Sequence, residues 1–80
     1  MKKRECNFEA RNIVGVRVRQ LRKAKGMKQK DFWALLQSIG MDISLTGLSR
    51  LEGQQRSVND YELVYISKAL EVSVEELLKD

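Results

Sequence analysis

Apolar residues recur at helical spacing in a series of short segments, and a capping residue or a glycine bounds each segment. The first stripe is Val14, Val18 and Leu21, and Gly26 follows it in the position of a left-handed cap. No alternating apolar and polar run is long enough to predict a strand, and no proline interrupts a helix. The pattern predicts an all-α fold.

Five helices are expected, joined by loops short enough for a compact bundle. The first extends from about residue 9 to Gly26, and the second begins near Gln29 and ends at Gly40. Residues 1–8 lack a helical period and are expected to form a basic flexible arm ahead of a single domain, residues 9–80.

Side chains that typically cap helices mark the starts of the other three helices. Ser44 is expected to cap the third helix. Asn59 with Glu62, and Ser73 with Glu76, have the spacing of capping boxes. These pairs predict a fourth helix and a short last helix.

Size and composition argue against an enzyme. Eighty residues make one small domain with little room for a deep cleft. The chain has no histidine and a single cysteine, Cys6, so the commonest general base and the usual zinc ligands are missing. No metal or cofactor is predicted. No apolar stretch approaches the roughly 20 residues of a membrane span, so no membrane partner is expected. The basic start of the chain is not followed by the apolar run of a signal peptide, and we expect a cytoplasmic protein.

The charge is unevenly distributed along the chain. Residues 1–30 hold 11 of the 15 basic residues and only 2 of the 11 acidic ones, a local charge of +9. Residues 31–80 carry −5, which gives the total of +4. This asymmetry fits a polyanion bound on one side of the molecule and a different role for the other side. A solvated helix face explains the charge equally well.

An ordered set of residues spans the expected helices: Gly15, Val18, Leu21-Arg22, Lys25-Gly26, Gln29, Phe32, Leu36, Leu48-Ser49-Arg50-Leu51-Glu52, Arg56, Asp60, Leu63, Ile66, Ala69-Leu70, Val72-Ser73 and Glu76-Leu77-Leu78. With this spacing, the run from Val14 to Leu78 resembles the Cro/cI-type helix-turn-helix family, also called lambda-repressor-like or Xre. The resemblance implies a five-helix DNA-binding domain of a bacterial or phage transcriptional regulator. Helices two and three would form the helix-turn-helix, with residues 45–52 in the major groove.

The chain departs from the family pattern at several positions. The stretch from Gln29 to Leu48 is longer than usual, as in a subgroup with a similar Asp42-Ile43-Ser44 turn. Trp33 stands where the family usually has a small residue. Lys28 replaces a capping Thr or Ser, at a cost of about 1 kcal/mol. Gly53-Gln54 replaces the usual Asn-Gly.

The resemblance assigns base contacts to Leu45, Thr46 and Arg50, with Ser49 beside them. Arg50 can bond a guanine edge, and Leu45 or Thr46 can meet a thymine methyl. Packing of Leu45 against the turn is an equal alternative. Gly47 is explained by a close approach to DNA, by one to helix two, or by chance.

Phosphate contacts are expected at the start of helix two and in the loop after helix three: Lys28, Gln29, Lys30, Gln55, Arg56 and Ser57. Gln29 matches the family's phosphate-binding glutamine. For the lysines, a solvated charge is the alternative. The arm Lys2-Lys3-Arg4 is either disordered or reaches around the duplex.

Arg22 and Glu52 match an arginine and a glutamate that the family pairs. We expect them to form a structural, partly buried ion pair that ties helix three to helix one.

Partners are predicted from the same features. The partner of the basic half is double-stranded DNA, bound by a homodimer that uses helix four or five of the acidic second half as its interface, away from the DNA. Alternatively, the domain is a protein-interaction module, an antitoxin or an adaptor, with a protein on its acidic half. Trp33 either fills the core or turn, which we favour, or lies in a subunit interface. Tyr61 and Tyr65 are likewise core edge or interface.

Overall fold

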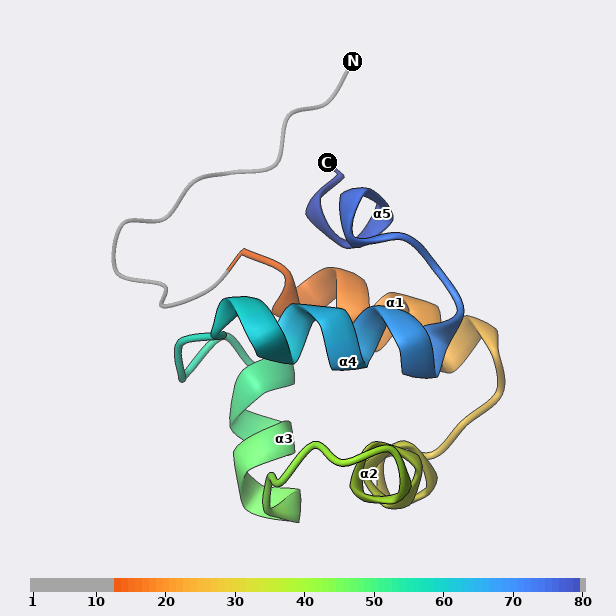
Figure 1. Cartoon of the computed structure of the whole chain (residues 1–80), viewed down its shortest axis with the longest axis vertical. Helices are drawn as coiled ribbons and strands as arrows, with labels where there is room; N and C mark the ends of the chain where they lie inside the picture. Colours follow the sequence, from red (N-terminus) through yellow and green to blue (C-terminus); the bar gives the residue numbers. More distant parts are fainter. Residues whose placement is uncertain (1–12, 80) are drawn as a thin grey trace.

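Five α-helices follow one another in the computed structural model, which describes residues 13–79 (Figure 1). They are α1 (Gly15–Ala24), α2 (Gln29–Ser38), α3 (Leu45–Glu52), α4 (Asp60–Leu70) and α5 (Val74–Leu78). Within the described range there is no strand, so the all-α prediction is confirmed.

The predicted start of the first helix is wrong within the described range. Residues 13 and 14 form a bend, and α1 begins at Gly15 rather than near residue 9. Val14 is the N-cap, and its side chain has no hydrogen-bonding atom, so it makes no cap bond and packs in the core. The predicted basic arm, residues 1–8, lies outside the described residues.

The helix ends follow the local sequence closely. Gly26 and Gly40 both have positive φ, 74° and 105°, and the amides after them bond back to Arg22 and Leu36 as in a Schellman motif. At the start of α2, Lys28 is the N-cap and makes no side-chain cap bond. The capping box of Asn59 and Glu62 is present.

The second predicted capping box forms only in part. The Ser73 hydroxyl accepts from the Glu76 N–H at 3.1 Å. The Glu76 carboxylate instead pairs with Arg17 of α1 and with Lys79. A charged guanidinium is a stronger partner for a carboxylate than a neutral backbone amide.

The loop after α3 places a non-glycine residue in the left-handed region. Gly53 has φ −87°, while Gln54 has φ 61°. The Gln54 and Gln55 amides bond to the carbonyls of Leu51 and Arg50, which completes a Schellman motif. The shift of glycine by one residue therefore leaves the strained position to Gln54.

The core lies where α1, α2, α3 and α4 meet, and α5 packs on α1 and α4 from the other side (Figure 1). Its buried apolar side chains are Val14, Val18, Phe32, Leu36, Met41, Ile43, Leu48, Leu51, Ile66, Ala69, Leu70 and Leu77. Burial of each large side chain contributes about 1.5–3 kcal/mol. Because α3 supplies Leu48 and Leu51 to this core, its opposite face is left on the surface.

Candidate nucleic-acid interface

α3 separates its core residues from its exposed ones. Leu48 and Leu51 are fully buried. The four residues predicted to read bases lie in exposed positions on the same helix: Leu45, Thr46, Ser49 and Arg50. Leu45 keeps 38% of its surface exposed, so the turn before α3 does not cover it fully.

The first turn of α3 is held by its cap and by the absence of a side chain at Gly47. The Ser44 hydroxyl accepts from the Gly47 N–H at 2.9 Å. A Cβ at Gly47 would lie 3.1 Å from both Ile43 Cγ1 and Ser44 Oγ. The close approach at Gly47 is therefore to the turn before α3.

The predicted ion pair between Arg22 and Glu52 is present and buried, with 6% and 5% of each residue exposed. Arg22 Nε and Nη2 donate to Glu52 Oε2 and Oε1 at 2.8 and 3.0 Å, and Nη1 donates to the Met27 carbonyl at 2.8 Å. Gln29 Nε2 donates to Glu52 Oε1 at 3.1 Å. The C-terminal end of α3 is thus bonded to α1 and to the first residue of α2.

The six residues predicted to meet phosphates differ in their surroundings. Lys28, Lys30, Gln55 and Ser57 are exposed. The Gln29 side chain is half-buried and engaged with Glu52. Arg56 forms a two-bond ion pair with the buried carboxylate of Glu62, at 3.2 and 3.0 Å.

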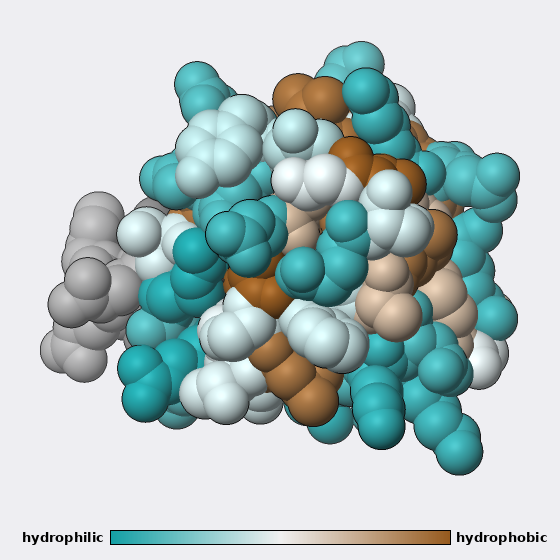
Figure 2. Space-filling view, turned by 60° about the horizontal axis from the view of Figure 1, so that its bottom comes forward, coloured by the Kyte–Doolittle hydropathy of each residue, from teal (hydrophilic) through white to brown (hydrophobic). Residues whose placement is uncertain are grey.

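The surface around α2 and α3 is mainly hydrophilic. Figure 2 shows this side of the molecule, with polar side chains surrounding separate hydrophobic areas. Of the four base-reading candidates, Leu45 is the large hydrophobic residue that remains exposed. A polar surface with isolated apolar contacts suits a nucleic-acid interface, which is more polar than a protein–protein one.

A comparison with protein families identifies the family of this helical domain. The family model of the Cro/C1-type HTH DNA-binding domain matches residues 17–80. The chain belongs to this family. No curated protein and no solved structure matches it. In this Cro/C1-type domain, α2 and α3 are the helix-turn-helix, and six residues, 39–44, connect them.

Sequence reasoning did not assign roles to Glu62 as an ion-pair partner or to Gln37. Glu62 carries a signal: an acid in a predicted capping box six residues after an arginine. Gln37 carries none, because its bonds are to backbone carbonyls of the α2–α3 connection. Trp33 is half-buried against the core, in line with the favoured interpretation of a turn-filling residue.

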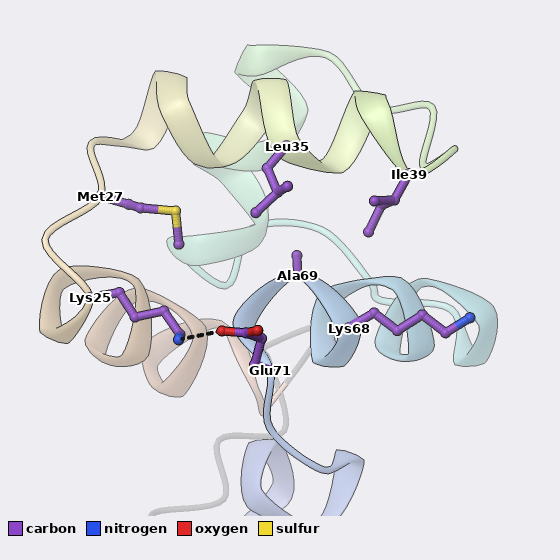
Figure 3. Close-up of a pocket in the computed structure, with 7 residues that line it drawn as sticks. All are labelled: Lys25, Met27, Leu35, Ile39, Lys68, Ala69 and Glu71. Carbon is purple, nitrogen blue, oxygen red and sulfur yellow. Dashed lines mark hydrogen bonds and ion pairs between the residues drawn. The ribbon is translucent and has the colours of Figure 1, made fainter.

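A groove lies between α2 and α4 of the Cro/C1-type domain, with a volume of about 470 Å³ (Figure 3). Met27, Leu35, Ile39 and Ala69 form its apolar part. Lys25, Lys68 and Glu71 complete the lining, and Lys25 pairs with Glu71 at 3.3 Å. Its lining comes from the α1–α2 connection, from α2 and the residue after it, Ile39, and from α4 and the residue after it, Glu71. It includes no residue of α3.

The described residues, 13–79, contain no group of three or more His, Cys, Asp or Glu side chains able to hold a metal ion. No helix among them is long and apolar enough to cross a membrane.

Proposed function

We propose that this Cro/C1-type domain is a sequence-specific transcriptional repressor that binds double-stranded DNA as a homodimer on a palindromic operator. It would act in the cytoplasm of a bacterial cell or a phage-infected host. The observation that carries the proposal is the family membership together with the exposed face of α3. A helix of eight residues with two buried leucines and four exposed residues on its other faces suits insertion into a major groove.

Base reading would come from that exposed face. Arg50 can donate two bonds to the O6 and N7 of a guanine, a contact worth roughly 1–3 kcal/mol of discrimination. Thr46 and Leu45 can contact a thymine methyl, and Ser49 can bond a neighbouring base edge.

Phosphate contacts would flank the base contacts. Lys28, Gln29 and Lys30 stand at the α2 N-terminus, where backbone N–H groups and the helix dipole favour an anion. Gln55 and Ser57 lie in the loop after α3. Arg56 already holds Glu62, so a phosphate contact from Arg56 would be shared with that carboxylate.

Two copies would place their α3 helices about one DNA turn apart on a two-fold symmetric site. Within the acidic second half of the chain, α4 or α5 would supply the dimer interface, away from the exposed face of α3 that would meet DNA. Sedimentation of the purified protein with and without its duplex tests this part. A monomer in both conditions removes the dimer from the proposal.

The deciding experiment is selection of bound duplexes from a random pool at about 0.15 M salt, where non-specific electrostatic binding is already weakened. A two-fold symmetric consensus is expected. Arg50→Ala should relax the preference at one base pair per half-site. The matched control is Arg19→Ala, which removes an exposed arginine from α1 and should leave the consensus unchanged.

Absence of enrichment from folded protein would overturn the proposal. The function would then pass to the other class that the sequence allows, a protein-interaction module, antitoxin or adaptor. Repression is tested separately, by placing the selected site over a promoter and measuring reporter output with and without the protein.

A further inference from the structure

The six-residue connection between α2 and α3 is packed into the fold. Met41 and Ile43 are buried, with 2% and 6% of each residue exposed. Gly40 has φ 105° and the Met41 N–H bonds to the Leu36 carbonyl at 2.9 Å. The connection therefore begins with a fixed turn and continues with two core residues.

One backbone carbonyl near the end of this connection accepts two bonds from α2. Trp33 Nε1 donates to the Ile43 carbonyl at 2.7 Å, and Gln37 Nε2 donates to the same oxygen at 2.6 Å. Gln37 Nε2 also donates to the Met41 carbonyl at 3.0 Å. A carbonyl oxygen has two lone pairs, so two side chains of α2 fill its acceptor capacity.

The position of this carbonyl matters because Ile43 directly precedes Ser44, the N-cap of α3. Residues 33 and 37 are four apart, which places both side chains on one face of α2. The Ile43 side chain also fills the space beside Gly47, where a Cβ would come within 3.1 Å. The two α2 donors thus act on the residue that leads into the first turn of α3.

Trp33 and the long connection therefore form one arrangement. A small side chain at position 33 has no N–H donor and cannot span to the Ile43 carbonyl. The indole supplies both a large apolar surface and one polar end, and both are used here.

From this geometry we infer that Trp33 and Gln37 are positioning residues for DNA recognition: they set how α3 is presented to the major groove by holding the Ile43 carbonyl. The inference rests on the proposed function. Neither residue is assigned a contact with DNA, and both act through the connection.

The test uses Trp33→Phe, which keeps an aromatic ring and removes the N–H donor, and Gln37→Leu, which removes the amide. Both are measured with the duplex selected by the wild-type chain, after circular dichroism has shown that each variant is folded. Each single variant should lose about tenfold in affinity for that duplex, which is about 1.4 kcal/mol. Affinity for an unrelated duplex should stay unchanged, because phosphate contacts carry non-specific binding.

The matched control is Tyr65→Phe. Tyr65 lies within 3.7 Å of where a Gly40 Cβ would be, so it borders the same connection from α4. Loss of the Tyr65 hydroxyl leaves both bonds to the Ile43 carbonyl in place. The Tyr65→Phe variant should therefore have the DNA affinity and base preference of the wild type. Wild-type affinity and preference in both Trp33→Phe and Gln37→Leu overturn the inference.

A second measurement does not depend on DNA. The Gly47 and Leu48 amides bond to the Ser44 hydroxyl and carbonyl. Their hydrogen exchange should accelerate at least about tenfold in the variants, while exchange in α1 stays the same. If the wild type selects no duplex, the proposed function fails, and unchanged exchange at these two amides then overturns the positioning role as well. Should Trp33→Phe not fold, Gln37→Leu, which alters an exposed residue, gives the decision alone.

Discussion

A buried carboxylate stands at each end of the loop between α3 and α4, and the two carboxylates differ in the partners that they bond. Glu52 ends α3 and is held by Arg22 and Gln29, whose side chains come from α1 and α2. Glu62 lies in the first turn of α4 and is held by Arg56 and the Asn59 N–H, both within six residues of it. The first network joins three helices, while the second joins a loop to the helix that follows it.

The difference shows how the burial of an ion pair, and the distance along the chain between its members, decide how much of the domain the pair stabilises. Both members of the first pair are almost fully buried, so each charge depends on the other. In the second pair the Glu62 side chain is 4% exposed and the Arg56 side chain is 30% exposed. If Glu62 is removed, water can therefore hydrate part of the Arg56 guanidinium in place of the carboxylate. The first pair should therefore control the stability of the whole domain, and the second mainly the loop.

Breaking the first network should have the largest effect. Glu52→Gln keeps the shape of the side chain but leaves the Arg22 guanidinium buried without a counter-charge. We expect the free energy of unfolding to fall by about 3 kcal/mol or more. Urea denaturation followed by circular dichroism measures it.

The control for this change is the double variant Arg22→Met with Glu52→Leu. Replacement of a whole buried pair by apolar residues is often neutral, so the double variant should be more stable than Glu52→Gln. A loss below 1 kcal/mol in Glu52→Gln would show that water reaches the pair and would end the contrast with Glu62.

Breaking the second network should cost less. Glu62→Gln retains an acceptor for the Asn59 N–H and removes the charge that Arg56 holds. Because Arg56 is already partly hydrated, we expect a loss of about 1–2 kcal/mol. The same denaturation experiment applies. If this variant is as unstable as Glu52→Gln, range and burial do not separate the two pairs.

A change in the loop between the two carboxylates should give a gain. Gln54 is held at φ 61°, a conformation that costs a non-glycine residue about 1–2 kcal/mol. Gln54→Gly removes this cost, but the greater conformational entropy of glycine stabilises the unfolded state by about 0.5–1 kcal/mol. The net gain should be about 0.5–1 kcal/mol, visible as a higher melting temperature. Gln55→Gly, one residue on, lacks the positive φ and should be destabilising.

The sequence was sufficient for most of the fold because its signals are local. Gly26, Gly40, Ser44 and Asn59 act within one helical turn, and each lies at the helix end that it predicts. The start of α1 was wrong because residues 13 and 14 lie at its edge with no capping side chain, so nothing local marks it.

The candidate site was less predictable, because its polar side chains have more than one partner within reach. Arg56 was assigned to phosphate, yet it holds Glu62. The Arg22–Glu52 pair came from the family resemblance and not from spacing, since its members are 30 residues apart. Gln37 bonds to backbone carbonyls, whose positions no residue identity reveals.

A third ion pair, Arg17 with Glu76, is more exposed than Arg22–Glu52, and of the three pairs its loss should have the smallest effect on stability. Both side chains are more than a quarter exposed. The Arg17 guanidinium first, and then the Lys79 ammonium, hold the pKa of the Glu76 carboxyl below its ordinary value of 4.5. A lowered pKa in the folded state contributes stability at pH values above the ordinary pKa, and this stability is lost as the pH falls through the folded-state pKa.

Unfolding measured from pH 6 down to about pH 3 should therefore show wild type and Glu76→Gln converging in stability on the acid side. Glu75→Gln, which changes an exposed carboxylate in the same turn, is the matched control and should stay parallel to the wild type. A constant difference between Glu76→Gln and wild type over this pH range would mean that packing of α5, and not the charge of Glu76, is what the substitution alters.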